Sequence, residues 1–188
     1  MLDQLIELDK TLLVFLNNLG SVYWDDFWAV VTNKRTFIPL YIVLLYFMSR
    51  TLNKKTTFVL VLLIASMILF TDQITNLFKF SFARLRPCAQ EGVLELIRQG
   101  DCWGYGFFSG HSSNSMAVAI FTGLMLKPVY KNTIYYMVVW SIVVAYSRIY
   151  LGLHYPLDIL CGLGFGAVAG YVFYRLFESL RVRFVYVD

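Results

Sequence analysis

The stretch SRIYLGLHYPLD, residues 147–158, decides the fold class, because it sets ionisable side chains between two segments apolar enough to cross a bilayer. Charge is costly in such a place, and ionisable residues there are candidates for function. Pro156 suits the first turn of a helix, where its missing N–H has no helical acceptor. If a helix begins there, we expect the side chains of His154 and Asp158, four residues apart, to point the same way.

A histidine beside a carboxylate is typical of nucleophilic catalysis. The carboxylate selects the tautomer of the imidazole and stabilises the positive charge that develops on the ring as its other nitrogen reacts. His154 and Asp158 could form such a pair. An equally good interpretation of the pair alone is a helix-start carboxylate beside an interfacial histidine.

The composition predicts an integral membrane protein. The 188 residues are 59% hydrophobic, 18% aromatic and only 15% charged, which favours one membrane domain over residues 1–188 rather than a soluble globule. The net charge of +4 is modest, and the basic residues form no nucleic-acid-binding face. We therefore expect a bilayer and a lipid as partners, and no nucleic acid.

The hydrophobic pattern predicts an all-α, polytopic helical bundle. Leucine and isoleucine recur at helical spacing in residues 1–20, opposite polar residues that include Asn17, so residues 1–33 are interpreted as an amphipathic, interfacial region. Burial of this helix against the bundle is the alternative. We expect about five transmembrane helices, near residues 37–48, 58–79, 109–127, 133–147 and 156–177, with residues 79–110 as an extracytoplasmic loop that carries part of the site.

Two further patterns concern packing and orientation. Gly162, Gly166 and Gly170 fall every fourth residue, which favours close approach of helices within the monomer over dimerisation. Lysine and arginine gather in two short turns and the C-terminal tail, so the positive-inside rule places that face in the cytoplasm. The residues are Arg50, Lys54, Lys55, Lys127, Lys131, Arg175, Arg181 and Arg183.

The remaining polar residues converge on the opposite face. Lys79, Arg86 and Arg148 would bring three cations there, and guanidinium groups suit the oxygens of phosphate. Ser109 and Gly110 begin a helix, where a hydroxyl and free N–H groups form an anion site. Each element alone has an ordinary interpretation, as a snorkelling cation or a helix cap. Their combination at three helix ends predicts a phosphate site.

With these residues in place, the chain resembles the type 2 phosphatidic acid phosphatase superfamily of integral membrane lipid phosphate phosphatases. The three parts of that family's signature match residues 79–87, 109–111 and 147–158, and the resemblance covers nearly all of residues 57–178. Phe108 departs from the pattern, since the family usually has proline before Ser-Gly-His. The departure concerns the path of the loop and no catalytic group.

The resemblance implies a role for each matching residue. His154 attacks phosphorus to form a phosphohistidine, Asp158 orients His154, and His111 protonates the leaving oxygen. The phosphate-binding residues are Lys79, Arg86, Ser109, Gly110 and Arg148. No cofactor is expected, and no metal, because the three cations would repel a divalent ion from the two histidines and the carboxylate.

The predicted function is hydrolysis of a lipid phosphate or diphosphate at the outer face of a bacterial cytoplasmic membrane. An isoprenoid diphosphate such as undecaprenyl diphosphate is the first substrate choice. The alternatives are a phosphatase of phosphatidylglycerophosphate, phosphatidate or lipid A, a lipid phosphotransferase, and a non-catalytic lipid-phosphate transporter. Cys88 and Cys102 lie on the same outer side and could form a disulfide in an oxidising compartment. The oligomeric state stays open.

Overall fold

The computed structural model of the chain describes residues 2–98, 102 and 104–185. Within this part the regular elements are helices, and the extended residues form one isolated bridge, between Leu85 and Tyr105. The α-helices are α1 Leu2–Asn18, α2 Val22–Thr32, α3 Ile38–Ser49, α4 Lys54–Phe82, α5 Gly110–Leu126, α6 Thr133–Tyr150 and α7 Pro156–Val185, with the short 3-10 turns η1 Pro87–Ala89 and η2 Leu94–Leu96 between α4 and α5. The all-α prediction is confirmed.

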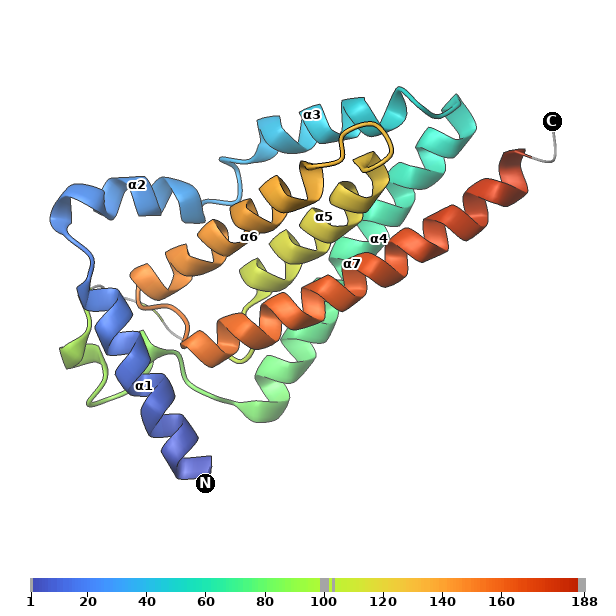
Figure 1. Cartoon of the computed structure of the whole chain (residues 1–188). Helices are drawn as coiled ribbons and strands as arrows, with labels where there is room; N and C mark the ends of the chain where they lie inside the picture. The colour runs from blue at the N-terminus through green and yellow to red at the C-terminus, as the bar shows by residue number, and fades with distance from the viewer. Residues whose placement is uncertain (1, 99–101, 103, 186–188) are drawn as a thin grey trace.

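Helix α5 is the centre of the bundle. It contacts α3, α4, α6 and α7, which run beside it, while α1 and α2 lie towards one end (Figure 1). Buried apolar side chains from α3, α4, α5, α6 and α7 form the main core around it, among them Leu60, Met67, Phe121 and Phe177. The N-terminal ends of α5 and α7 and the C-terminal ends of α4 and α6 are thereby brought to the same end of the bundle.

The glycines of α7 allow that helix to lie directly on α5. A Cβ on Gly162 would stand 2.6 Å from the backbone oxygen of Ser109, and one on Gly170 would stand 2.5 Å from that of Ala117. Gly166 faces the backbone oxygen of Ser113 in the same way. As expected from their spacing, the three glycines serve packing within the monomer.

The predicted spans correspond to α3–α7, and α4, α6 and α7 are longer than the hydropathy pattern indicated. Helix α4 begins at Lys54, where the side chain of Asn53 accepts a hydrogen bond from Thr56, and it continues to Phe82, so that Lys79 lies on the helix and not in a loop. In the described part of the chain, two helices are long and apolar enough to cross a membrane, Lys54–Phe82 and Pro156–Val182, and α3 is a shorter apolar helix. Five spans stay a prediction.

Helix α1 buries polar side chains beside a leucine and leaves other apolar side chains exposed. Asp9, Leu13 and Asn17 face the bundle, whereas Leu8 and Phe15 are exposed. The amide of Asn17 donates hydrogen bonds to the backbone oxygens of residues 149 and 150, at the end of α6. The prediction that Asn17 lies on the outward polar face was wrong. The carbonyls at a helix end have no acceptor role within the helix, so they can accept hydrogen bonds from a buried amide. The helix both packs on the bundle and exposes an apolar side.

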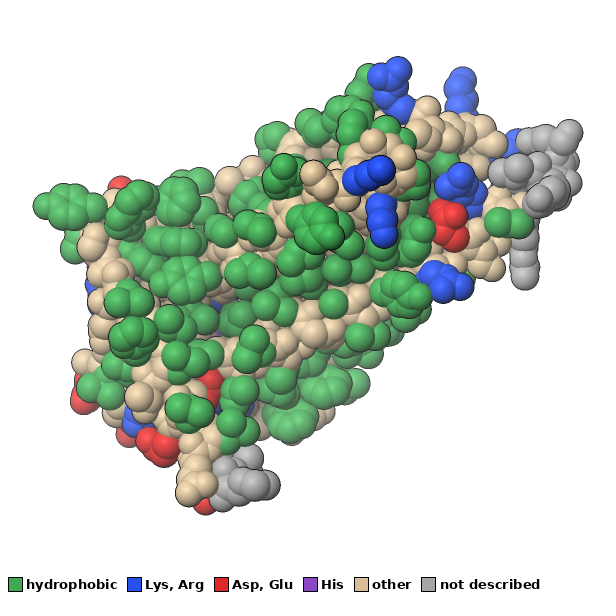
Figure 2. All heavy atoms as spheres, viewed as in Figure 1, with side chains coloured by type: hydrophobic (Ala, Val, Ile, Leu, Met, Phe, Trp, Pro, Cys, Tyr) green, Lys and Arg blue, Asp and Glu red, His purple; other side chains and the backbone are tan. Residues whose placement is uncertain are grey.

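Lysine and arginine side chains gather at the end of the bundle that holds the α3–α4 turn, the α5–α6 turn and the C-terminal half of α7 (Figure 2). The sides of the bundle are largely apolar in the same view. This basic end is the one predicted to face the cytoplasm, although the side chain of Arg183 lies outside the described part. The polar residues of the predicted site lie at the other end.

Candidate active site

A polar cavity of about 230 Å³ lies where the ends of α4, α5 and α6 meet the segment before α7. Six of the eight residues predicted for the site line it, and they come from three regions far apart in the sequence. The lining residues are Lys34, Asp72, Asn76, Lys79, Arg86, Gly110, His111, Arg148 and His154. The structure thus brings together the cations and both histidines around one polar cavity.

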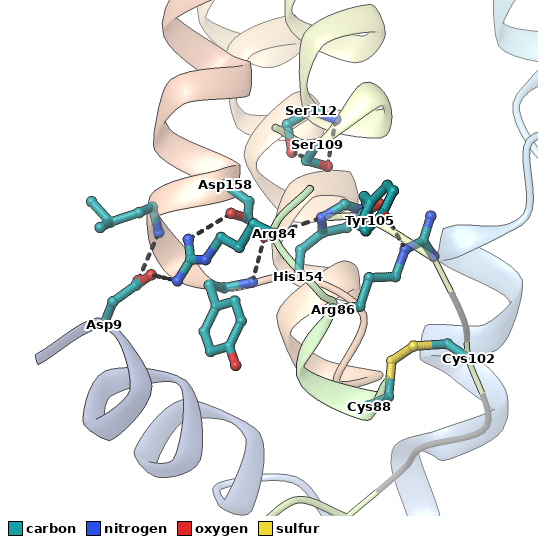
Figure 3. Close-up of polar contacts among 12 residues, drawn as sticks. Asp9, Arg84, Arg86, Cys88, Cys102, Tyr105, Ser109, Ser112, His154 and Asp158 are labelled. Atoms are coloured by element: carbon teal, nitrogen blue, oxygen red, sulfur yellow. Dashed lines mark hydrogen bonds and ion pairs between the residues drawn. A yellow bond between two sulfur atoms is a disulfide. The ribbon is translucent and has the colours of Figure 1, made fainter. Parts of the chain in front are cut away.

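His154 and Asp158 form the predicted pair. Helix α7 begins at Pro156, so His154 lies just before the helix and Asp158 in its first turn. The Nδ1 atom of His154 is 3.4 Å from Oδ2 of Asp158, a distance that is long for a hydrogen bond (Figure 3). Such bonds commonly tighten when substrate binds. The Oδ2 atom also accepts a hydrogen bond of 3.0 Å from the backbone N–H of Tyr155.

The imidazole of His154 is almost fully buried, with 1% of the residue exposed. Burial lowers the pKa of His154 to about 4, although the hydrogen-bonding and charge interactions with Asp158 act in the opposite direction. Arg148 and Arg86 add to the lowering. The ring is therefore neutral near pH 7, and the nitrogen remote from Asp158 keeps the lone pair that a nucleophile needs.

Arg84 connects this pair to helix α1. Its Nη1 atom donates to Oδ1 of Asp158 at 2.8 Å, and its Nη2 atom donates to Oδ2 of Asp9 at 2.6 Å (Figure 3). The guanidinium also stacks on the ring of Tyr155, 4.0 Å from its centroid. Burial acts to lower the pKa of Arg84, but Asp158 and Asp9 outweigh it and raise that pKa.

Sequence reasoning did not find Asp9, because it resembles any polar residue of an amphipathic helix. Arg84 was recognisable only as a cation that touches substrate or lies in the interface. The structure shows a different role, since both ends of its guanidinium contact buried carboxylates. Only the tertiary contact between α1 and the start of α7 shows that the two residues belong to the site's surroundings.

The three predicted cations reach the cavity from separate elements. Lys79 lies in the last turn of α4, and Arg148 lies near the end of α6, where it donates to the hydroxyl of Thr32. Arg86 follows α4, and its Nε atom donates to the backbone oxygen of Tyr105 at 3.3 Å. Burial lowers the pKa of Arg86, with Asp158 opposing the shift.

Lys34 is a fourth cation that sequence reasoning missed. It lies in the connection between α2 and α3, and it lines the same cavity as Lys79 and Arg148. In the sequence it follows a run of interfacial aromatic residues, so it had the appearance of an ordinary interfacial lysine. No motif signals its place, which depends on how α2 packs against α6.

The Ser-Gly-His sequence opens α5 as predicted. Gly110 and His111 line the cavity, and a Cβ on Gly110 would lie 3.8 Å from Nζ of Lys79, so the glycine leaves room beside that cation. Ser109 is fully buried: its hydroxyl accepts hydrogen bonds from Ser112, and its N–H donates to the backbone oxygen of Asp158. Its part in binding phosphate stays a prediction.

The loop between α4 and α5 is held closed at its base. The backbone N–H of Arg86 donates to Gly104, and the N–H of Gly106 donates to Arg84. Cys88 and Cys102 form a disulfide across the loop, with their Cα atoms 5.6 Å apart (Figure 3). These ties place Arg84 and Arg86 next to the start of α5.

Phe108, the departure from the family pattern, is buried among aromatic rings. Its ring centroid lies 5.1 Å from that of Phe78 and 5.2 Å from that of Phe165. The side chain thus packs between the C-terminal part of α4 and the first half of α7, just before Ser109. Phe108 therefore has a packing role, away from the polar cavity.

A second cavity, of about 500 Å³, adjoins the polar one along α3, α4 and α5. Lys34, Asp72 and His111 line both cavities, and most other residues of the second one are apolar. Asp72 accepts a hydrogen bond of 2.7 Å from Asn114, whose own oxygen accepts one from Thr71. Asp72 is thus held at the junction by a partner on α5.

The fold and the site together define a class: a helical bundle with membrane-length apolar helices, whose end carries clustered cations around a histidine–carboxylate pair. A family model for the PAP2 superfamily matches residues 55–181. The chain belongs to this superfamily, the type 2 phosphatidic acid phosphatases, as the sequence motifs predicted. It is accordingly a lipid phosphate hydrolase.

The curated relatives are similar over most of their length. The chain is 34% identical to a lipid A 4'-phosphatase of Bacteroides thetaiotaomicron, over 97% of this chain and 83% of that protein. It is 30% identical to a lipid A 4'-phosphatase of Porphyromonas gingivalis, over 98% of this chain and 79% of that protein.

Two solved structures share the fold. LpxE of Aquifex aeolicus aligns with a TM-score of 0.67 and 20% identity, covering 88% of this chain and 93% of that one. A transmembrane PAP2-type phosphatidylglycerolphosphate phosphatase of Bacillus subtilis aligns with a TM-score of 0.71 and 18% identity, covering 94% and 87%. At these identities the likeness concerns the fold alone.

Proposed function

We propose that this chain removes a phosphate from an acylated sugar lipid, with the 4'-phosphate of lipid A as the first candidate. Both curated relatives described above are lipid A 4'-phosphatases and align along nearly the whole chain. They favour lipid A, one of the alternatives from the sequence, over undecaprenyl diphosphate.

The observation that carries the proposal is the pair of adjoining cavities. The polar one suits a phosphate, and the apolar one of about 500 Å³ has a size typical of ligand sites and suits a hydrocarbon chain. Asp72 and Lys34 lie between them, where the head group of a bound lipid would stand. A phosphate ester with an attached acyl group would thus fill both cavities at once.

The mechanism follows from the positions of the two histidines. Lys79, Arg86 and Arg148, with Lys34, neutralise the charge on the phosphate oxygens, which is largest in the transition state. The Nδ1 atom of His154 faces Asp158, so its Nε2 atom attacks phosphorus and the P–O bond to the lipid breaks. His111 donates a proton to the leaving oxygen, since an alkoxide leaves poorly. Water then hydrolyses the phosphohistidine, with His111 as the base.

Transfer of the phosphate to a second lipid uses the same first step and differs only in the acceptor. A non-catalytic transporter has no use for a second histidine opposite the His154–Asp158 pair. Hydrolysis therefore stands first, in agreement with the chain's family.

The site is proposed to face the extracytoplasmic side of a bacterial cytoplasmic membrane. Lysines and arginines of the turns and of α7 gather at the opposite end of the bundle, which the positive-inside rule assigns to the cytoplasm (Figure 2). A disulfide beside the site accords with an oxidising compartment.

The test is phosphate release by the purified protein in detergent. The panel contains lipid A bisphosphate, undecaprenyl diphosphate, phosphatidylglycerophosphate and phosphatidate, with the His154→Ala variant as the control. We expect the highest kcat/KM for lipid A, with mass spectrometry locating the loss at the 4' position. Faster hydrolysis of undecaprenyl diphosphate than of lipid A would reverse the substrate assignment.

A further inference from the structure

We propose that Asp9 and Arg84 are positioning residues that hold the His154–Asp158 pair for attack on phosphorus. The inference rests on the proposed function, because it assigns both residues a part in that reaction. Asp9 belongs to α1 and Arg84 to the loop after α4, and neither lines the phosphate cavity. They meet at the start of α7, where Arg84 lies between Asp9 and Asp158 (Figure 3).

The carboxylate of Asp158 is held at both of its oxygens. Arg84 binds Oδ1 at 2.8 Å, and the N–H of Tyr155 binds Oδ2, the oxygen that faces His154. The side chain of Asp158 has no exposed surface. Because one oxygen is anchored by the guanidinium, the carboxylate cannot rotate away from the imidazole without leaving a buried charge unpaired, which is costly.

Asp9 holds the same segment at two points. Its Oδ2 atom binds Arg84 at 2.6 Å, and its Oδ1 atom accepts a hydrogen bond of 2.9 Å from the N–H of Leu157. Leu157 is the second residue of α7, so this N–H is one of those that a helix leaves without an internal acceptor. A carboxylate from α1 therefore caps α7 and fixes the turn that carries His154 and Asp158.

The charges of the group also suit the reaction. With both carboxylates ionised and Arg84 positive, the group carries one net negative charge before the reaction. The ring of His154 becomes cationic when its Nε2 atom bonds to phosphorus and its Nδ1 atom keeps a proton. The net negative charge of the group then stabilises the new positive charge on the ring beside it. Without Asp9 the group would be neutral.

A purely structural ion pair would have a different signature. Its loss would lower the stability of the fold and leave kcat per folded molecule unchanged, whereas the loss of a positioning residue lowers kcat. The charges act on His154 in addition: Asp9→Asn removes a negative charge and lowers the pKa of His154, while Arg84→Met removes a positive charge and raises it. The other charged or titratable groups around His154 stay in place in both variants: Lys34, Asp72, Lys79, Arg86, His111 and Arg148.

The experiment measures this pKa by NMR of histidine-labelled protein in detergent, with kcat and KM measured beside it. The chain has only two histidines, so a His111→Gln variant assigns the signals. For Asp9→Asn we expect kcat to fall roughly ten- to hundredfold with KM nearly unchanged, as for other residues that orient a reactive ligand. The matched control is Asp25→Asn, which breaks the 3.1 Å ion pair with Arg98 at the same end of the bundle.

Unchanged kcat and an unchanged pKa of His154 in Asp9→Asn, as in the control, would overturn the proposal. If Asp9→Asn does not fold, Arg84→Lys serves instead, because lysine keeps the charge but lacks the fork that joins two carboxylates. Its kcat should fall while the pKa of His154 changes little, and a wild-type kcat would again reject the proposal. The NMR titration needs no turnover, so failure of phosphate release on every lipid would refute the proposed function separately.

Discussion

Gly162 lies against the backbone carbonyl of Ser109, so closely that a Cβ would stand 2.6 Å from its oxygen. The contact joins the start of α5 to the second turn of α7, and beside it the N–H of Ser109 donates to the backbone oxygen of Asp158. The distance between the two helices therefore sets the distance between the Ser-Gly-His segment and the His154–Asp158 pair. The site depends on this packing as much as on its charged residues.

Gly166→Ala should destabilise the bundle, because its Cβ would overlap the carbonyl oxygen of Ser113 and approach Met116. Overpacking of this kind costs about 1–3 kcal/mol. Gly164→Ala is the matched control, since a Cβ there meets nothing within 4 Å. Thermal unfolding in detergent measures both, and equal melting temperatures for the two variants would contradict the packing role.

His154→Ala should abolish both turnover and the covalent intermediate, because His154 is the proposed nucleophile. When the wild-type enzyme is quenched during turnover of a radiolabelled substrate, acid-labile phosphate should be found on the protein.

Activity should survive EDTA and be inhibited by vanadate, since fixed cations neutralise the phosphate. Loss of activity on chelation, restored by zinc or magnesium, would refute the assigned roles of Lys79, Arg86 and Arg148.

His111→Ala should slow substrates according to their leaving groups. A sugar alkoxide needs a proton from His111, whereas a nitrophenolate departs without one, so the variant should lose more activity on the first substrate than on the second. General acid catalysis of this kind typically contributes about 10²–10⁴-fold. Comparable losses on both substrates would instead assign His111 to binding.

Reduction of the Cys88–Cys102 disulfide should destabilise the loop that carries Arg84 and Arg86. The bond closes a loop of about 15 residues, for which chain entropy gives roughly 3 kcal/mol. Mass mapping of non-reduced protein should recover the two cysteines in one linked peptide. Recovery of both as free thiols would reject the bond, and the Cys161→Ser variant should unfold like wild type.

The orientation can be tested by cysteine labelling in a Cys161→Ser background. Single cysteines at Lys54 and Lys131, at the basic end, should react only with reagents that reach the cytoplasm. A cysteine at Glu91, an exposed residue of the loop near the site, should react from outside. The reverse pattern would place the site on the cytoplasmic face.

The sequence alone predicted the all-helical class, the helix start at Pro156 and the residues of the phosphate site. These features are local. An apolar run, a proline at a first turn and a short motif at a helix end can each be recognised from a few neighbouring residues. Lys79, Arg148 and His154 could be assigned to one membrane surface because each lies at the end of an apolar segment.

The tertiary structure decided which polar groups meet. Asp9 and Lys34 join the surroundings of the site from the N-terminal region, and Arg84 contacts two carboxylates rather than the cavity. No local pattern encodes these contacts, because a buried ion pair or cap across 70 or more residues depends on how the helices pack. The sequence therefore determined the chemistry available to this protein, and the packing of α1, α5 and α7 decided its geometry.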